Sequence, residues 1–446
     1  MKIFNTGYGL DENVIRQISK IKNEPEWMLQ FRLKGYEAFK KLPLPKWGPD
    51  LSFINFDDFI YYSKYEIDKK KEWDDLPEKI KTTFEKLKVS KEEAKFLNGL
   101  ETQLDSEMVY GQIFKEVEKK NVILTDLDTA VKKYPELVQK YLGKLIYSNE
   151  HKFAALNSAV WSGGTFIYVP KNTVVDLPLH TYFRINNKSV GQFERTLIIV
   201  DDNSSLQYIE GCTAPIYSED NLHAANVEVY VGKNSKMQYT TIQNWSDNVL
   251  NLVTKRAVVD AHGYMSWIDG NLGSRINMKY PCTILKGEYA SSECVSIAVS
   301  HQNVNQDTGA KMIHLAPNTR SKIISKTIAS GNGIANYRGL VEIKKDAINS
   351  YSHVKCDSLF LNKESKGLTF PHEMIENNSS GIEHEAYISK LNQENMFYLM
   401  SLGIDKKTAK NMMLIGFIAP FSNRLSLEYS VELNRLLELE IDEEEE

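Results

Sequence analysis

The chain has 446 residues, of which 42% are hydrophobic and 25% charged, and its formal net charge is −5. These values are typical of a soluble globular protein and exclude the strongly basic surface that nucleic-acid binding would need. Four cysteines in this length argue against a disulfide scaffold, and no apolar run reaches the roughly 20 residues needed to cross a bilayer. The N-terminal residues also carry no apolar signal segment, so we expect a cytoplasmic protein, or a stromal one in a plastid-bearing source.

Residues 1–150 are predicted to form a mostly helical N-terminal domain, with helix as the main element over residues 1–110. Asp11 is placed to cap one helix, and Pro25 to begin a second, since proline suits the first turn of a helix. A further helical passage covers residues 126–141. These features favour a packing or docking domain.

Residues 151–391 are predicted to form a β-rich core domain in which short β-branched and aromatic runs alternate with turns. One sequence pattern recurs, and its copies begin at Val200, Val231 and Val259, which are 31 and 28 residues apart. It consists of a β-branched residue, five turn residues and then alternating large residues. Units that cannot bury their own face must stack, which predicts a mainly β fold of the solenoid type, with a β-sandwich as the alternative.

The last part, residues 392–446, is predicted to be helical again. Three amphipathic helices are expected between Met396 and Leu437, with Asp405 capping the second. They would either cap the open end of a solenoid or dock a partner, and the pattern fits both. The acidic run at residues 443–446 is expected to be a solvated tail.

A candidate metal site lies in the strand-like tracts around Cys356 and His384. A thiol, an imidazole and the carboxylates of Glu383 and Glu385 are ligands for first-row metals. No compact zinc motif places a cysteine and a histidine 28 positions apart, so the spacing alone does not establish the site. The alternatives are a small buried thiol, a core histidine on the same strand face as Ile382, and two solvated glutamates.

Three further cysteines have different surroundings. Cys212 lies in a tract with glycine and proline, which favours a loop and an exposed, reactive thiol. Cys282 and Cys294 lie in strand-like surroundings and are expected to be structural. The chain has no GxxxxGK[ST] loop, so we expect it to bind no nucleotide, and it has no GxSxG nucleophile elbow.

Several tracts spread over nearly the whole chain carry a family resemblance. They are EPEWMLQFRLKGYEAF (24–39), TYFRINNKSVGQFERTLIIV (181–200), YIEGCTAPIY (208–217), QNW (243–245), NTRSKIISKTIASG (318–331), YRGLVEI (337–343), KCDSL (355–359) and EHEA (383–386). In these tracts the sequence resembles the SufB/SufD family of the Suf iron–sulfur cluster assembly machinery, and most closely its SufB scaffold subunits. The resemblance implies a right-handed parallel β-helix core flanked by N-terminal and C-terminal helical domains.

The resemblance also implies roles for individual residues. Cys356 matches the family's essential sulfur-accepting cysteine, at the place where the cluster is built. His384 and Glu385 match the pair that holds the nascent cluster with this cysteine, and Glu383 is a weaker addition. Cys212 matches the cysteine at which sulfur arrives from a donor. The polar residues proposed along an internal sulfur-transfer path correspond to Arg184, Asn186, Gln243, Trp245 and Lys255.

The implied cargo is a transient [4Fe-4S] or [2Fe-2S] cluster, assembled from persulfide sulfur and iron and then passed to apo iron–sulfur proteins. One thiolate with imidazole and carboxylate would bind it weakly enough for release. The chain itself would not be an enzyme, because ATP hydrolysis would belong to the partner SufC, docked on the C-terminal helices. SufD or a second SufB copy would pair through solenoid edge strands, and a cysteine desulfurase or sulfur carrier would deliver the sulfur.

Three other assignments are open at this point. A SufD-like partner subunit would have the same fold with a supporting site, although the cysteines of the CDS and EGCTAP tracts and the EHE triplet favour SufB. A β-helix enzyme acting on carbohydrate would carry a secretion signal and a long acidic groove, and neither is evident. A purely structural interaction module would have inert cysteines. Some relatives carry a CxxC-type cluster in the N-terminal third, which this chain lacks because its first cysteine is Cys212.

Overall fold

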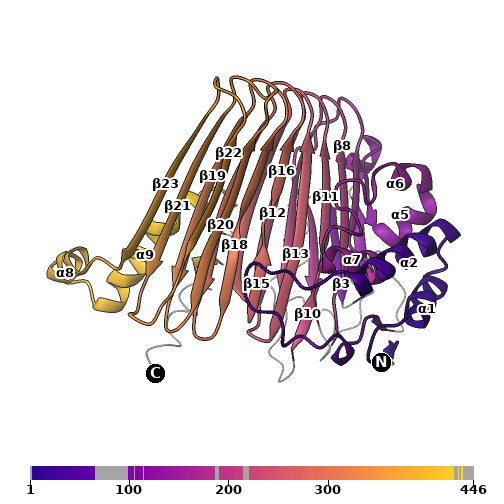
Figure 1. The fold of residues 1–446 in the computed structure, drawn as a ribbon, viewed down its shortest axis with the longest axis horizontal. Helices are drawn as coiled ribbons and strands as arrows, with labels where there is room; N and C mark the ends of the chain where they lie inside the picture. Colours follow the sequence, from indigo (N-terminus) through magenta and orange to yellow (C-terminus); the bar gives the residue numbers. More distant parts are fainter. Residues whose placement is uncertain are drawn as a thin grey trace.

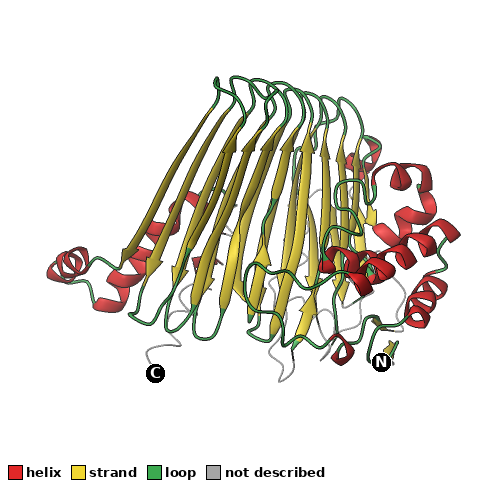
Figure 2. Ribbon diagram, in the orientation of Figure 1, coloured by secondary structure: helices red, strands yellow, loops and turns green. Residues whose placement is uncertain are grey.

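The computed structural model of the chain describes residues 3–65, 99–104, 106–113, 115–185, 190–213, 220–425, 430 and 433–434. In these residues a long parallel β-solenoid forms the middle of the molecule, and helices lie at its two ends (Figures 1 and 2). The predicted mainly β fold of the solenoid type is therefore confirmed, and the sandwich alternative is wrong.

Two sheets form the walls of the solenoid. We call them the eleven-stranded and the ten-stranded sheet, after the number of strands that each has among the described residues. The eleven-stranded sheet consists of β5 (Ile123–Asp126), β6 (Thr165–Val169), β8 (Arg195–Val200), β10 (Asn221–His223), β11 (Asn226–Val231), β13 (Val249–Val259), β15 (Ile276–Lys279), β16 (Cys282–Leu285), β18 (Asn305–His314), β20 (Ile334–Ile343) and β22 (Thr369–Ile375). The ten-stranded sheet consists of β3 (Gly99–Leu104), β4 (Glu107–Ile113), β7 (Leu179–Arg184), β9 (Ser205–Thr213), β12 (Lys236–Trp245), β14 (Tyr264–Gly273), β17 (Ser291–Ser300), β19 (Arg320–Ala329), β21 (Tyr351–Phe360) and β23 (Gly381–Lys390).

The coils stack with the period that the sequence predicted. Val231 of β11 lies in register between Val200 of β8 and Val259 of β13, which are 31 and 28 residues away. On the facing wall, β12 lies in the same way between β9 and β14. Apolar side chains of the two walls meet across the interior and form one continuous core. Stacking thus buries the face that a single coil would leave exposed.

Asparagines at the turns join successive coils. Asn172, Asn203 and Asn234 each have a positive φ, between 55° and 58°. Asparagine adopts this left-handed conformation more readily than most residues. The side-chain amide of Asn234 donates to Oδ1 of Asn203, and that of Asn203 donates to Oδ1 of Asn172, both at 3.0 Å. The same side chains therefore suit the turns and link them to one another.

Helices of the N-terminal part cover the outer face of the eleven-stranded sheet (Figure 1). Asp11 accepts a hydrogen bond from the backbone N–H of Val14 and caps α1 (Glu12–Lys22), and Pro25 directly precedes α2 (Glu26–Lys41), both as predicted. The other elements described here are β1 (Ile3–Asn5), η1 (Phe56–Asp58), β2 (Ser63–Tyr65), α4 (Lys115–Lys119), α5 (Leu127–Lys133), α6 (Pro135–Tyr141) and α7 (Lys152–Val160).

Strands β3 and β4 occupy a stretch in which the sequence predicted helix. β3 pairs in parallel with β7 and antiparallel with β4, and so continues the ten-stranded sheet beyond β7. The edge of β7 offers a row of backbone N–H and C=O groups that need partners. Pairing with this edge outweighs the weak local preference of these residues for helix.

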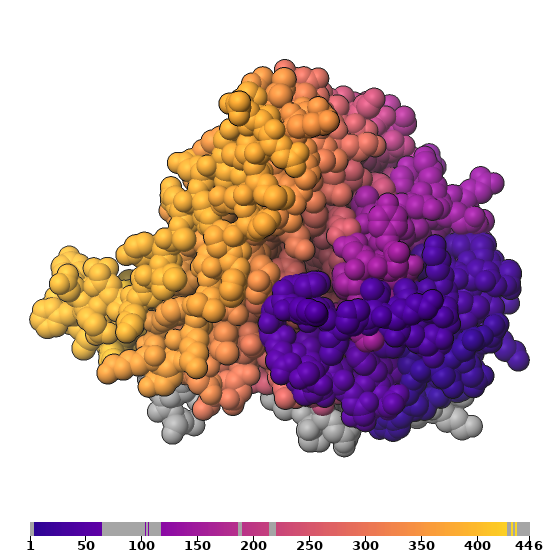
Figure 3. Space-filling model, in the orientation of Figure 1, coloured from indigo at the N-terminus to yellow at the C-terminus, as the bar shows by residue number. Residues whose placement is uncertain are grey.

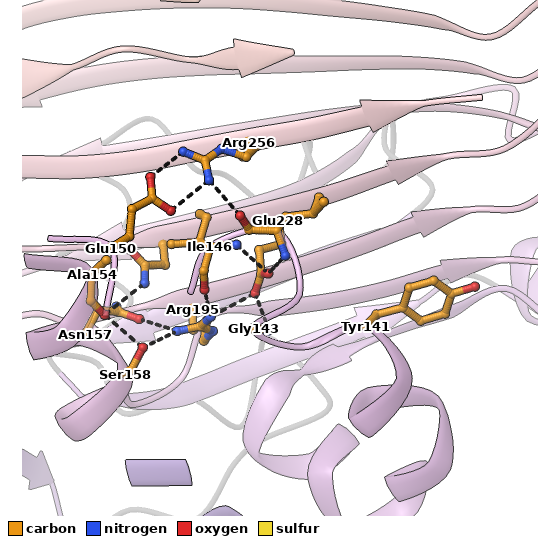
Figure 4. A network of polar contacts seen from close by, with 12 residues as sticks. Tyr141, Gly143, Ile146, Glu150, Ala154, Asn157, Ser158, Arg195, Glu228 and Arg256 are labelled. Atoms are coloured by element: carbon orange, nitrogen blue, oxygen red, sulfur yellow. Dashed lines mark hydrogen bonds and ion pairs between the residues drawn. The ribbon is translucent and has the colours of Figure 1, made fainter. Parts of the chain in front are cut away.

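A buried ion pair holds the N-terminal part against the solenoid (Figure 4). Arg195 of β8 and Glu228 of β11 lie 2.8 Å apart, and both side chains are sealed from solvent. Glu228 also accepts hydrogen bonds from the backbone N–H groups of Gly143, Leu145 and Ile146, at 2.9 to 3.1 Å. Because one carboxylate accepts hydrogen bonds from a guanidinium and from three backbone N–H groups, it holds the segment between α6 and α7 on the sheet.

The C-terminal helices begin beyond β23. α8 (Gln393–Ser401) stands out from the end of the solenoid (Figure 3), whereas α9 (Lys406–Ser422) lies on the outer face of the ten-stranded sheet. Asp405 caps α9 by accepting from the N–H of Thr408, as predicted. The third predicted helix lies outside the described residues except for residues 430, 433 and 434. None of the helices that the structure describes combines the length and apolar character that crossing a membrane demands.

Candidate functional site

The last two strands of the ten-stranded sheet bring Cys356 and His384 together. Val354 of β21 lies in register with His384 of β23, and Cys356 follows Val354 by two residues on the same inward face. The Sγ atom of Cys356 lies 3.2 Å from Nε2 of His384. Two residues 28 positions apart in the sequence therefore meet between the walls, at the last strands described.

The surroundings of Cys356 keep its thiol protonated. Burial raises the pKa of Cys356 to about 11, and the carboxylates of Asp357 and Glu373 act in the same direction. The thiolate is the form that attacks sulfur and binds metal. Nε2 of His384 is the group placed to accept the thiol proton. The imidazole is therefore needed both for attack on sulfur and for metal binding by the thiolate.

Glu373 completes this group, although the sequence analysis did not single it out. It lies on β22, in register with the core residue Val341, and so faces inward from the other wall. Its Oε1 atom lies 2.7 Å from Nδ1 of His384. Alternation along β22 could have shown that Glu373 shares a face with Ile375, but no local signal tells which strand the carboxylate faces.

Glu383 and Glu385 point the other way. Side chains alternate along a strand, so the residues on either side of His384 lie on the outer face of the sheet. Oε2 of Glu385 lies 3.0 Å from Nζ of Lys355, and Glu383 accepts a hydrogen bond from the hydroxyl of Tyr351. Across the residues that the structure describes, no three His, Cys, Asp or Glu side chains are grouped to hold a metal ion. The thiol and the imidazole are therefore the ligand atoms already in place.

Cys212 lies in strand β9 and is buried, so the expected loop with an exposed thiol is wrong. Its strand pairs on both sides, with β7 and with β12, and this pairing outweighs the local turn signal. The side chain packs with Phe183 and Trp245. Its Sγ lies 3.9 Å from Oε1 of Glu210. Burial raises the pKa of the Cys212 thiol well above its usual value, and the carboxylates of Glu210 and Glu194 add to the effect.

Three residues of the expected sulfur path lie in the interior near Cys212. Gln243 is in register with Cys212 on the next strand, and Trp245 follows on the same inward face. Lys255 reaches this interior from β13 of the facing wall and is almost fully buried. The structure therefore brings the side chains of these three residues to the region of the Cys212 thiol.

The two other path residues are not part of this arrangement. Arg184 ends β7 next to the inward-facing Phe183, and alternation puts it on the opposite face. Asn186 lies outside the described residues. The structure thus gives positions inside the solenoid to three of the five residues.

Two charged residues that the sequence analysis passed over, Asp269 and Lys279, lie at the centre of the same interior. Oδ1 of Asp269 is 3.0 Å from Nζ of Lys279 and 3.3 Å from Nζ of Lys255. Lys279 also donates to Oε1 of Gln243 at 2.7 Å. Burial lowers the pKa of Lys279 to about 8. Although burial opposes it, the two lysines hold the pKa of Asp269 below its usual value. Alternation from the core residue Trp267 was the signal that could have placed Asp269 inside.

A row of six polar residues crosses the inner face of the ten-stranded sheet, one on each of six neighbouring strands. In register from β9 to β21, it consists of Glu210, Thr241, Asp269, Ser296, Ser325 and Cys356. All of them are buried, and Ser296 Oγ donates to Ser325 Oγ at 3.2 Å. Five steps of about 4.8 Å put the two ends of the row roughly 24 Å apart. The row leads from the neighbourhood of Cys212 to the thiol at the end of the solenoid.

Known proteins match the chain over almost its full length. Residues 97–181 match the SufBD protein N-terminal region, and residues 183–417 match the SUF system FeS cluster assembly, SufBD core domain. Proteins of Staphylococcus aureus strains MRSA252 and USA300 and of Staphylococcus haemolyticus are each 50% identical over 442 residues, which is 99% of this chain and 95% of the relative. All three are named iron-sulfur cluster assembly SufBD family proteins.

Proposed function

The chain belongs to the SufBD family of the SUF iron–sulfur cluster assembly system, and we propose that it acts there as a SufB-type scaffold. In this role it assembles a transient iron–sulfur cluster at Cys356 and His384 and passes the cluster to apo-proteins. The observation that carries the proposal is the 3.2 Å approach of the thiol to the imidazole at the last strands of the solenoid. Thiolate and imidazole are both ligands for iron.

Sulfur would enter at Cys212, delivered by a cysteine desulfurase or a sulfur carrier. The buried polar row from Glu210 to Cys356 supports movement through the interior, because its hydroxyl groups can donate hydrogen bonds to a sulfur anion that an apolar core would exclude. Lys255 and Lys279 lie beside this row and bring positive charge to the same interior. These lysines would stabilise a migrating persulfide or hydrosulfide anion.

The cargo would be a [4Fe-4S] or [2Fe-2S] cluster, held through the Cys356 sulfur and the His384 ring. A site with a single thiolate binds less firmly than a set of four, which suits a protein that must release what it assembles. Glu385 and Glu383 face outward in the state described, so their participation requires β23 to turn relative to β21. β23 pairs with β21 alone among the described strands, which leaves it the freedom of an edge strand.

Partners would bind at the same end of the molecule. β22 and β23 are the outermost strands of their sheets, and their open backbone edges are suited to SufD or to a second copy of the chain. The ATPase SufC would bind the C-terminal helices, whose exposed apolar residues are Phe397, Tyr398, Met400, Leu402, Met412 and Ile415. Crosslinks between SufC and residues 390–440 should appear in the complex, and a SufC complex without them would contradict this docking site.

The test of the scaffold is anaerobic assembly of a cluster on the purified protein from iron and sulfide. Cys356→Ala should abolish the visible absorption of the cluster, because the sulfur ligand is removed. Cys294→Ala is the matched control, since Cys294 is buried in the same core two strands away. An undiminished cluster in the Cys356→Ala variant, with the control also intact, would refute the assignment.

A SufD-like role is the second candidate, favoured by the outward direction of Glu383 and Glu385 in the isolated chain. A partner subunit would need a SufB chain to complete its site. The two roles differ in what the chain does alone: a scaffold assembles the cluster without a second protein, whereas a SufD-like subunit binds iron and sulfide only in the mixed complex. The same anaerobic experiment, with and without a SufB-type partner, separates them.

A further inference from the structure

We propose that Glu373 is a positioning residue for the thiol–imidazole pair, acting through the ring of His384. It would accept the Nδ1–H of the ring and thereby keep the Nε2 lone pair directed at the Cys356 sulfur. The geometry consists of two contacts in series, 2.7 Å from Glu373 to Nδ1 and 3.2 Å from Nε2 to the sulfur. This inference rests on the proposed function only in the role that it gives to the Cys356 thiol.

The direction of the first hydrogen bond follows from the groups involved. An ionised carboxylate has no hydrogen and can only accept, so the ring must donate from Nδ1. A neutral imidazole carries one N–H, which leaves Nε2 as the nitrogen with the free lone pair. That nitrogen is the one that faces Cys356. Glu373 therefore selects the tautomer, and it also fixes the rotation of the ring.

Both uses proposed for His384 need this tautomer. To accept the proton of the Cys356 thiol, the ring must present a lone pair to sulfur, and to bind iron it must present the same lone pair to the metal. Histidines that bind metals commonly donate their other N–H to a carboxylate, which orients the ring. Glu373 occupies that supporting position, one contact away from the reacting atoms.

Two other carboxylates at this end of the solenoid, Glu385 and Glu376, make a different kind of contact from Glu373. Glu385 pairs with Lys355 on the outer face, and Glu376 pairs with Lys344, each at 3.0 Å. Those pairs join a carboxylate to a lysine on the surface. Glu373 instead comes from β22 in one wall and meets a histidine on β23 in the other, so it connects the last strands of both sheets.

The sulfur-transfer step shows what this positioning would achieve. Nε2 of His384 takes the proton of the Cys356 thiol, and the thiolate attacks the outer sulfur of a donor persulfide, R–S–SH. A new S–S bond forms on Cys356 while the S–S bond of the donor breaks, and the leaving R–S⁻ keeps the electron pair and takes the proton from the imidazolium. The products are the Cys356 persulfide and R–SH, so no oxidant or reductant is required.

The first measurement is the tautomer of His384, read from the ring ¹⁵N shifts of histidine-labelled protein, with His384→Gln used to assign the signal. The wild type should show Nδ1–H. Glu373→Leu removes the acceptor and should shift the ring toward the Nε2–H form, whereas Glu373→Gln keeps an oxygen acceptor and should restore Nδ1–H. Glu385→Leu, on the outer face, should leave the signal unchanged. An unchanged tautomer in Glu373→Leu would overturn the proposal.

The second measurement is persulfide formation on Cys356 after exposure to cysteine persulfide, followed by the added mass of one sulfur atom. Glu373→Leu should slow it about ten-fold or more, while Glu373→Gln and Glu385→Leu should stay close to the wild type. Equal rates in Glu373→Leu and the wild type, with both proteins folded by circular dichroism, would overturn the positioning role. If the wild type itself gains no sulfur at Cys356, the proposed function fails, and the NMR result still decides whether Glu373 orients the ring.

Discussion

Lys279 and Asp269 form an ion pair of 3.0 Å inside the solenoid, where neither side chain is more than 4% exposed. Lys255 shares the same carboxylate at 3.3 Å, so two buried cations depend on one anion. We expect Asp269→Asn to lower the free energy of unfolding by about 3–5 kcal/mol, because it leaves two buried lysines without their counter-ion. Denaturant unfolding measures the change. Asp202→Asn breaks an exposed pair with Lys171 and should have little effect, and similar losses in the two variants would contradict the expectation.

The buried carboxylate of Glu228 should contribute as much to the free energy of unfolding, but for a different reason. Glu228→Leu would leave the guanidinium of Arg195 without its counter-ion and three backbone N–H groups without their acceptor. We expect a loss of about 3–5 kcal/mol in the free energy of unfolding. Limited proteolysis should then cut first between α6 and α7, the segment that the carboxylate holds. Glu376→Leu, which breaks a surface pair, is the control. An intact link in the Glu228 variant would show that other contacts hold it.

The buried ring of His314 predicts a loss of stability in mild acid. Burial lowers the pKa of His314 to about 4, with Arg320 acting in the same direction, whereas an unfolded histidine titrates near 6.5. Between these values the unfolded chain binds the extra proton, so the free energy of unfolding falls as the pH falls, by up to about 1.4 kcal/mol per pH unit for this residue. His314→Gln should reduce the slope of the free energy of unfolding against pH by the amount that corresponds to one bound proton. A slope that is the same in both proteins would mean that folding does not lower the pKa of His314.

The exposed apolar residues of α8 and of its C-cap, Leu402, should contribute to binding and not to folding. Phe397 and Leu402 are 74% and 61% exposed, so Phe397→Ser with Leu402→Ser should leave the melting temperature almost unchanged. The same variant should no longer copurify with the ATPase subunit. Tyr387→Ser, on β23, removes an equally exposed aromatic residue and should keep the ATPase. Retention of the ATPase by the α8 variant would exclude this helix from the interface.

The solenoid itself could be predicted because its signals are local and repeated. The positions of Val200, Val231 and Val259 gave the register of three strands, and Asp11 and Asp405 marked helix starts through the chemistry of capping. Capping depends on residues that are close in the sequence, and the repeat depends on a local pattern that recurs along the chain.

The parts that could not be predicted depend on contacts between distant segments. Cys212 was expected in a loop because glycine and proline lie nearby, yet two neighbouring strands pair with its backbone and bury the thiol. Strand β3 forms because the edge of β7 is available. The contact of Glu373 with His384 joins two different sheets. Alternation tells which side chains share a face of one strand, but it does not tell what lies opposite that face.

Every coil adds one residue to the polar row that ends at Cys356. The length of this row therefore changes only by whole strand spacings. Removing a complete coil of about 30 residues could let the strands on either side close up in register, and the thiols would then be nearer by one strand spacing, about 4.8 Å. A shift of the strands by one residue would instead turn the row outward. Relatives of this chain can therefore change the distance between the two cysteines only by whole coils, each of which adds or removes one strand spacing.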